Sequence, residues 1–252
     1  MIATYKEYSF PDDKGYKPIH VGKDLELNDL GICGDNSGDN ISFLNKSFSE
    51  LTGIYWAWKN NESDYVGLVH YRRYFKPIID RSVIVKGKGV ASSKDLLNLT
   101  KNYDVIIPRR RCYVVDTIQS HYNNAHYEHD LKALEAIIAE CCPEYLTSFG
   151  VVMNGRCMSP YNIFFMNKEN FSSYCSWLFQ LLFKLEKVLP YKNYPPYQGR
   201  VFGFLAERLF NVWLEHNKYK LKIKRLPIKN IEGENLLLKG IALLKRKYLV
   251  RK

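Results

Sequence analysis

A histidine and two adjacent arginines follow a short apolar run in the first third of the chain. The run is Tyr65–Val69, and His70, Tyr71, Arg72 and Arg73 come directly after it. Two guanidinium groups suit a diphosphate, because the planar fork of arginine pairs bidentately with phosphate oxygens and does not lose its proton. The alternative, given equal weight for an isolated arginine pair, is the solvated end of a strand. The elements around these residues must decide between the two.

The apolar run is too short for a helix and is bounded by charge, so we expect a buried strand over Tyr65–Val69. In open α/β sheets, ligands bind in the crevice outside the carboxyl ends of the strands. We therefore expect His70, Arg72 and Arg73 at the mouth of a binding site.

A loop rich in Gly, Asp and Asn spans residues 31–42. This composition forms tight turns at little steric cost and presents side-chain oxygens and backbone N–H groups to a ligand. Asp35 and Asp39 are possible metal ligands, and their surroundings fit a nucleotide-binding turn equally well. Ser42 or Asn45 is expected to cap the helix that follows.

The rest of the chain alternates strand patterns with helix patterns. Strands are expected over residues 1–4, 17–21, 103–108 and 162–166, and helices over 49–58, 130–140, 177–185 and 200–214. The Gly- and Lys-rich stretch 86–94 is expected to be a mobile surface loop. Strands that alternate with helices predict an α/β fold with a mainly parallel or mixed sheet.

The composition fits one domain in the cytoplasm. The chain has 252 residues, is 46% hydrophobic and contains six cysteines without a C-x-x-C pair, so we expect the cysteines to be reduced and buried. No apolar stretch approaches the roughly 18 residues that span a bilayer, and the first residues lack signal-peptide features.

Positive charge is concentrated at the end of the chain. Residues 217–252 contain twelve Lys and Arg against two Glu, which leaves +10 of the formal +11 of the whole chain. Leucines fall on one helical face between these lysines, so residues 229–252 are expected to form a basic amphipathic helix on an anionic membrane surface. A merely solvated helix is the plainer alternative. Nucleic acid is a rival partner, but no recognised nucleic-acid-binding motif is present.

Four blocks of sequence occur in a recognisable order, and His-Tyr-Arg-Arg-Tyr-Phe is the most specific part of them. The blocks are Asp35–Ser42, Leu51–Trp58 with Tyr65–Phe75, Tyr161–Met166 and Arg200–Leu209. They resemble bacterial capsular and exopolysaccharide glycosyltransferases first described as a domain of unknown function. The resemblance runs from residue 1 to about residue 228, which we take as the glycosyltransferase domain.

The resemblance implies a single-domain, Rossmann-like A-type glycosyltransferase fold with a mixed central sheet. Some members of the family are associated with galactofuranosyl transfer from a UDP-linked donor. The family usually has Thr-His-Lys after its first strand, whereas this chain has Thr4, Tyr5 and Lys6. A role for that histidine is therefore not carried over.

A sugar-nucleotide transferase must neutralise its departing diphosphate, which most A-type enzymes do with a metal bound to Asp-x-Asp. This chain has His70-Tyr71-Arg72 where that motif is expected. Arginine can stabilise the diphosphate directly. Metal-independent transfer is therefore favoured, and a divalent metal such as Mn²⁺ or Mg²⁺ stays open.

Glu207 is the first choice for the base that deprotonates the acceptor hydroxyl, because it precedes Arg208 near the start of a helix. The equally weighted alternative is a buried structural ion pair of these two residues. Asp116 and His121 are the other candidates. Histidines 121, 126 and 129 do not have the spacing of a standard metal site and are expected in an acceptor groove or at the surface.

The chemistry and the resemblance together predict a set of donor-binding residues. They are Thr4, Lys6, Asp35, Asp39, Asn40, His70, Arg72, Arg73, Asn162, Arg200 and Arg208.

The leading hypothesis is an inverting hexosyltransferase on the inner face of the cell membrane. It takes a sugar, galactofuranose among the candidates, from a UDP-linked donor to a lipid-linked capsular, exopolysaccharide or O-antigen intermediate. A second hypothesis is a non-catalytic nucleotide-sugar or glycan-binding subunit of a polysaccharide assembly complex. A third is a nucleic-acid-binding protein that uses the basic tail.

Overall fold

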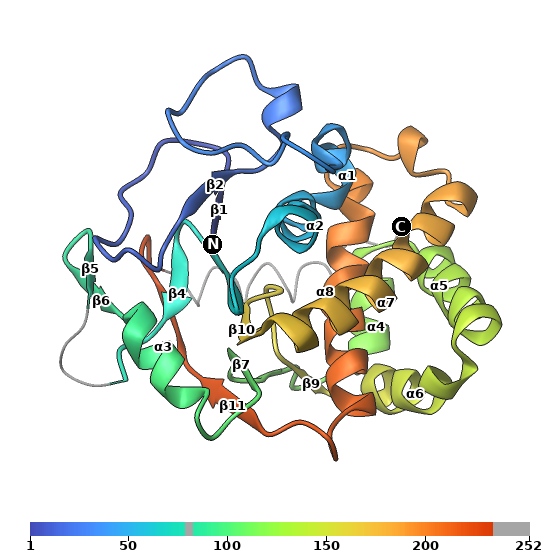
Figure 1. Cartoon of the computed structure of the whole chain (residues 1–252). Helices are drawn as coiled ribbons and strands as arrows, with labels where there is room; N and C mark the ends of the chain where they lie inside the picture. Colours follow the sequence, from blue (N-terminus) through green and yellow to red (C-terminus); the bar gives the residue numbers. More distant parts are fainter. Residues whose placement is uncertain (79–82, 234–252) are drawn as a thin grey trace.

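The computed structural model describes residues 1–78 and 83–233. A mixed sheet lies between two unequal layers (Figure 1). From one edge to the other, its strands are β11 (Ile223–Leu226), β7 (Val105–Pro108), β10 (Phe164–Asn167), β3 (Tyr65–His70), β1 (Ile2–Thr4) and β2 (Pro18–His20). Beside this path, β4 (Arg73–Phe75) pairs with β3, and β12 (Ile228–Asn230) pairs with β4.

The pairing directions bring several strand ends to one edge of the sheet. Strands β2, β1 and β3 are mutually parallel, and β11 is parallel to β7. Strand β10 is antiparallel to both β3 and β7, so β3 and β7 run the same way. The carboxyl ends of β1, β2, β3 and β7 therefore meet the segment that leads into β10.

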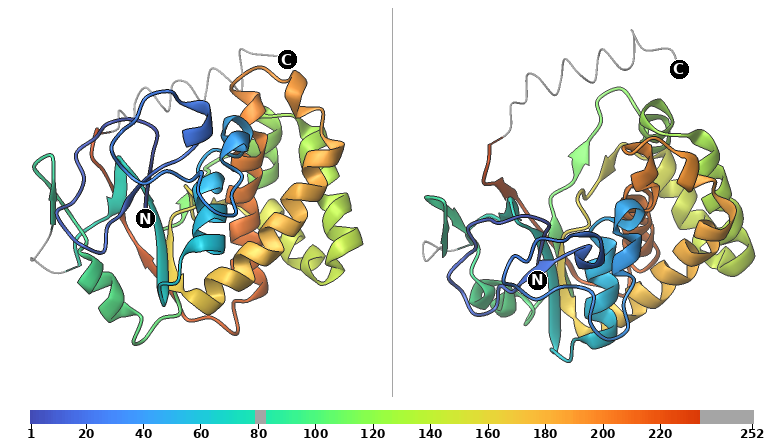
Figure 2. Two further views of the ribbon diagram at one scale, coloured as in Figure 1. Left: turned by 45° about the horizontal axis from the view of Figure 1, so that its top comes forward. Right: turned by 90° about the horizontal axis from the view of Figure 1, so that it is seen from above.

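Helices cover the two faces of the sheet unequally. They are α1 (Asn45–Phe48), α2 (Leu51–Asn60), α3 (Ser93–Leu99), α4 (Ile118–Ala125), α5 (Glu128–Cys141), α6 (Leu146–Asn154), α7 (Lys168–Val188) and α8 (Val201–His216). Helices α2 and α4 to α8 gather on one side, whereas α3 and the hairpin of β5 (Val83–Val85) and β6 (Lys88–Val90) lie on the other (Figure 2).

Alternation along the central strands explains why both faces are covered. In β7, Val105 and Ile107 belong to the core on the larger helical side, and Ile106 belongs to the opposite core. In β3, Leu68 and Val69 divide in the same way. Because successive strand side chains point to opposite faces, a continuous apolar run must be buried on both. This confirms the predicted α/β fold.

The stretch 86–94 is not the loop that its composition predicts. It contains the turn and second strand of the β5–β6 hairpin and the start of α3. The Ser92 hydroxyl caps α3 by accepting a hydrogen bond from the Asp95 N–H (3.0 Å). Glycine and lysine suit a hairpin turn as well as a loop, and the pairing partner decides between them.

Two other local predictions are wrong. Neither Ser42 nor Asn45 caps a helix, since the Ser42 hydroxyl donates to Asp35 (2.5 Å) and the Asn45 amide donates to the Ser49 carbonyl (2.8 Å). Residues 229 and 230, placed at the start of the predicted basic helix, belong to strand β12. The rest of that prediction, from residue 234 on, lies outside the described residues.

The cysteines are not all reduced. Cys112 in β8 (Arg111–Cys112) and Cys157 in β9 (Cys157–Met158) form a disulfide across this two-stranded ladder. The sequence separation of 45 residues gave no pairing signal. Within the described residues, no helix is long and apolar enough to cross a membrane.

Candidate functional site

A cavity of about 640 Å³ opens at the edge of the sheet where the parallel strands end. Tyr5 follows β1 there. His70 is the last residue of β3, Arg73 is the first residue of β4, and Arg72 lies between the two strands. Strand β1 lies between β2 and β3. The connection from β1 to β2 therefore goes to one side of β1, and the later connection to β3 goes to the other side. Such a topological switch point is where open α/β sheets bind their ligands.

Positive charge is in excess on the cavity wall. The cations that line it are Lys46, Arg72, Arg73 and Arg200, and the carboxylates are Glu50 and Glu207. A concave surface with an excess of one charge raises the local concentration of ligands of the opposite charge. The arrangement therefore suits an anion.

Arg73 presents unused hydrogen-bond donors to this cavity. Its Cζ lies 4.4 Å from the centre of the Tyr161 ring, which holds the guanidinium by a cation–π contact. Its Nε is buried without a hydrogen-bond partner, and Arg73 makes no ion pair within the described part of the chain. A buried donor without a partner is unfavourable unless a ligand supplies the acceptor.

Arg72 is already paired with an acidic side chain from a distant part of the sequence. Its Nη1 donates to Glu232 Oε2 at 3.1 Å, and Lys6 Nζ lies 3.8 Å from Glu232 Oε1. The hydrogen bond from Arg72 lowers the pKa of the Glu232 carboxyl. One carboxylate therefore lies between two of the cations that the sequence assigns to the donor.

A strained turn precedes β10, and its first residue, Tyr161, lines the cavity, whereas Asn162 is buried and does not. Tyr161 and Asn162 have φ values of 79° and 52°, in the left-handed region that residues other than glycine rarely adopt. The Tyr161 N–H donates to Glu207 Oε1 (2.5 Å), and the Tyr161 carbonyl accepts from His70 Nε2 (2.8 Å). Asn162 Nδ2 donates to Glu50 Oε1 (2.9 Å). Three charged or titratable side chains thus hold two strained residues.

A third strained residue lies at the same cavity. Ser49, with φ 53°, lines it, and the Ser49 hydroxyl accepts a hydrogen bond from Arg200 Nε at 3.1 Å. Lys86 is the remaining non-glycine residue with positive φ in residues 1–78 and 83–233. Backbone strain of this kind concentrates at functional sites, because it persists only where the surroundings impose it.

His70 is held as a neutral imidazole. Burial lowers its pKa, and the charge of Glu50 is the strongest influence in the opposite direction. With Nε2–H donating to the Tyr161 carbonyl, the neutral ring keeps Nδ1 as an acceptor.

Glu207 and Arg208 form the ion pair that the sequence suggested, with Arg208 Nη1 at 3.2 Å from Glu207 Oε2. The Arg208 side chain is buried, donates to the Phe204 carbonyl (2.8 Å) and lies 5.1 Å from the centre of the Tyr122 ring. Glu207 lines the cavity, whereas Arg208 is not part of its lining. Arg208 therefore lies behind the wall rather than in contact with a ligand.

Asp35 is not in the cavity either. It is completely buried, and its carboxylate accepts hydrogen bonds from the backbone N–H groups of Gly22 and Lys23 and from the hydroxyls of Ser42 and Thr52. All of its acceptor capacity serves the turn after β2. This corrects the prediction that Asp35 contacts the donor or a metal.

Five more predicted donor-binding residues lie outside the cavity lining, namely Thr4, Lys6, Asp39, Asn40 and Asn162. The contacts of Lys6 and Asn162 are described above. Thr4 Oγ1 donates to the Lys6 carbonyl (2.7 Å), Asp39 accepts from the Tyr55 hydroxyl (3.1 Å), and Asn40 Oδ1 accepts from the Ser42 N–H (3.1 Å). Within the described residues, no group of three or more His, Cys, Asp and Glu is arranged to hold a metal.

Asp116 and His121, the alternative bases, lie near α4 and do not line the cavity. The His121 ring stacks on Tyr113 with 3.9 Å between centroids. Neither residue is positioned to take a proton from a ligand in this cavity.

Sequence reasoning missed Glu50, Ser49 and Tyr161. A glutamate at the start of a helix ordinarily favours the helix dipole and gives no sign of a site. Tyr161 is the first residue of one of the four sequence blocks and directly precedes the predicted strand 162–166. Its left-handed conformation follows from contacts to residues 46 and 91 positions away.

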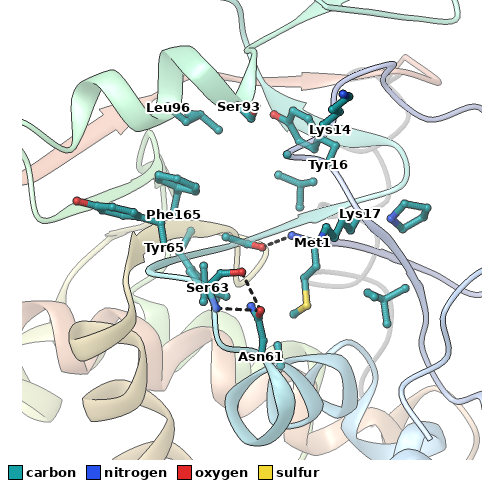
Figure 3. Close-up of a pocket in the computed structure, with 18 of the residues that line it drawn as sticks. Met1, Lys14, Tyr16, Lys17, Asn61, Ser63, Tyr65, Ser93, Leu96 and Phe165 are labelled. Atoms are coloured by element: carbon teal, nitrogen blue, oxygen red, sulfur yellow. Dashed lines mark hydrogen bonds between the residues drawn. The ribbon is translucent and has the colours of Figure 1, made fainter. Parts of the chain in front are cut away.

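A second cavity, of about 880 Å³, lies at the amino ends of the parallel strands. Figure 3 shows Met1 there, with its amine donating to the Gly67 carbonyl (2.5 Å), near Lys14 and Lys17. No arginine lines this cavity among the described residues. Because ligands of open α/β sheets bind at the carboxyl ends, the smaller cavity is the stronger candidate.

Comparison with known proteins defines the class of the fold. The chain is similar to the apo structure of WbbM, a bifunctional glycosyltransferase, with a TM-score of 0.83 and 30% sequence identity over 93% of this chain. The fold is therefore the A-type glycosyltransferase fold with a mixed central sheet. The chain spans 45% of the length of that structure.

A family profile described as "Domain of unknown function (DUF4422)" matches residues 1–218. The chain belongs to this family. No curated protein matches the chain.

Proposed function

We propose that this chain is a glycosyltransferase that takes a hexose from a UDP-linked donor. One observation carries the proposal. Arg73, at the start of β4 and next to Arg72, has an Nε–H without a partner and lines a cavity at the switch point of an A-type glycosyltransferase fold. The likeness to a bifunctional glycosyltransferase supports the reaction class, although the chain spans less than half of that protein.

The arginines supply the electrostatic part of the reaction. As the bond between the anomeric carbon and the diphosphate breaks, negative charge grows on the leaving oxygens. Donors fixed in advance at that position stabilise the charge without reorganisation. Arg72 and Arg73 take this role at the strand end that has His70-Tyr71-Arg72 in place of Asp-x-Asp, so we propose that transfer proceeds without a divalent metal.

Transfer with inversion requires one base for the acceptor hydroxyl. The acceptor oxygen attacks the anomeric carbon opposite the diphosphate while a carboxylate takes its proton. Glu50 and Glu207 are the carboxylates of the described residues that line the cavity.

The acceptor we propose is a lipid-linked capsular, exopolysaccharide or O-antigen intermediate, and galactofuranose is the first sugar to test. The resemblance of the four sequence blocks supports both. The +10 charge of residues 217–252 supports peripheral association with the anionic inner face of the cell membrane.

The test is release of UDP by the purified full-length chain from a panel of UDP-sugars, with UDP-galactofuranose included, in the presence of lipid-linked acceptors. Parallel reactions contain EDTA or Mn²⁺. We expect acceptor-stimulated release from at least one donor and the same rate in EDTA. UDP binding without turnover of any donor would instead support the non-catalytic subunit.

A further inference from the structure

We propose that Glu50 is the general base of the transfer and that Glu207 is a positioning residue that holds the turn at Tyr161. This inference rests on the proposed function, and it concerns which of two carboxylates in one cavity takes the acceptor proton.

The hydrogen bonds of Glu207 leave it poorly suited to accept a proton. Oε1 accepts the Tyr161 N–H at 2.5 Å, and Oε2 lies 3.2 Å from the buried guanidinium of Arg208. Both oxygens of the Glu207 carboxylate are therefore already engaged by donors from the protein. Protonating Glu207 would break the ion pair and weaken the bond that fixes Tyr161.

Only one of the two carboxylate oxygens of Glu50 accepts a hydrogen bond from the described residues. Its Oε1 accepts from Asn162 Nδ2 at 2.9 Å. Among the described residues, no donor is bonded to Oε2 and no cation forms an ion pair with Glu50. The side chain is half-buried and lines the cavity, so Oε2 has the capacity to receive a proton from a bound hydroxyl.

Asn162 has a strained backbone and a buried oxygen without a partner, and its side-chain amide orients Glu50. The residue is 2% exposed, has a φ of 52°, and its Oδ1 is buried without a hydrogen-bond partner. Its Nδ2 makes the 2.9 Å bond to Glu50 and a long contact of 3.5 Å to the Gly203 carbonyl. Strain and an unsatisfied buried oxygen both carry a free-energy cost, and such costs are typical of residues that fix a reactive group.

The location of Glu50 also fits the direction of the reaction. Glu50 lines the same cavity as His70, the last residue of β3, and as Arg72 and Arg73, which are proposed to hold the diphosphate. A base must lie within hydrogen-bond reach of a hydroxyl that faces the anomeric carbon, which this end of the cavity allows.

The step is a single displacement. The acceptor O–H proton passes to Glu50 Oε2 while the acceptor oxygen forms its bond to the anomeric carbon. The bond from that carbon to the diphosphate oxygen breaks, and its electron pair stays on the diphosphate beside Arg72 and Arg73.

The test compares Glu50→Gln, Glu50→Asp and Glu207→Gln in the full-length chain. The matched control is Glu62→Gln, an exposed glutamate paired with Lys168 away from the cavity. UDP affinity by calorimetry, melting temperature, turnover and the pH dependence of kcat are measured for each. Glu50→Gln keeps an oxygen for the Asn162 bond but cannot act as a base.

We expect Glu50→Gln to bind UDP within about threefold of wild type, to lose turnover by roughly 100-fold or more, and to lose the acidic limb of the pH profile. Glu50→Asp should keep that limb at a reduced rate. Glu207→Gln should melt at a lower temperature and keep the limb. Near-normal turnover of Glu50→Gln, or loss of the limb in Glu207→Gln, would overturn the assignment. Failure of the wild-type chain to bind UDP would overturn the proposed function itself.

Discussion

The carboxylate of Glu232 lies 3.1 Å from the guanidinium of Arg72, although the two residues are 160 positions apart. Lys6 approaches the same carboxylate at 3.8 Å. An acidic side chain thus pairs with two cations that we propose for the donor phosphates. A bound diphosphate would have to displace Glu232 from Arg72.

Removing the charge of Glu232 should therefore strengthen donor binding. Glu232→Gln frees Arg72 and Lys6 from a competing carboxylate, and we expect UDP affinity by calorimetry to rise by roughly threefold to tenfold. The same substitution at Glu62, which pairs with Lys168 elsewhere, should leave the affinity unchanged. Weaker UDP binding by Glu232→Gln would show that the carboxylate positions Arg72 for the ligand and does not compete with it.

Asp35 should matter for stability rather than for donor contacts. Asp35→Ala leaves the N–H groups of Gly22 and Lys23 and two hydroxyls without their acceptor, so we expect a loss of about 3 to 5 kcal/mol in the free energy of unfolding. Urea denaturation measures it. Asp39→Ala, at a side chain that is 58% exposed, should change stability by less than about 1 kcal/mol. Equal effects of the two substitutions would contradict this account of Asp35.

Stability should fall as the pH drops below about 6.5, the ordinary pKa of histidine. Burial lowers the pKa of His70 and of His20 in the folded state. The unfolded chain therefore binds protons in a range where the folded chain does not, so acid favours unfolding. His70→Gln should flatten the dependence of melting temperature on pH between 5 and 7. An unchanged slope in His70→Gln would contradict the neutral imidazole.

The basic end of the chain is expected to bind membranes independently of the donor cavity. Deleting residues 234–252 should abolish sedimentation with anionic liposomes and leave UDP affinity within about twofold of the full chain. Because the attraction is electrostatic, salt should weaken binding of the full chain. Binding that is equal on neutral and anionic liposomes would contradict the electrostatic part of the proposal.

Strands β1, β2, β3, β7 and β10 were predictable because their signal is local, whereas β4, β8, β9, β11 and β12 were not predicted. An apolar run such as Tyr65–Val69 cannot be left exposed, and the polar His70 and the arginines after it mark where it ends. The hairpin and α3 were missed because Gly and Lys residues have no strong preference of their own, and pairing partners fixed the outcome.

The candidate site was only partly predictable. His70, Arg72 and Arg73 line one cavity, as their place after a strand implied, and Arg200 and Glu207 line the same cavity from the region of α8. Contacts between distant parts of the sequence could not be inferred. Asn162 is hydrogen-bonded to Glu50, which is 112 residues away, and Arg72 is hydrogen-bonded to Glu232, which is 160 residues away. The prediction that Asp35 binds a ligand failed because a carboxylate in a Gly-rich loop can accept hydrogen bonds either from a ligand or from the turn itself.

Titration of UDP into the wild-type chain, Arg72→Ala and Arg73→Ala tests the central claim most directly. A lost charge-assisted contact is worth about 1.5 to 3 kcal/mol, so each substitution should weaken binding roughly tenfold to a hundredfold. Arg73→Lys should recover only part of the loss, because lysine lacks the fork and the stacking contact with Tyr161. Unchanged affinity in both alanine variants, with melting temperatures like that of the wild type, would contradict the assignment of this cavity to the donor diphosphate.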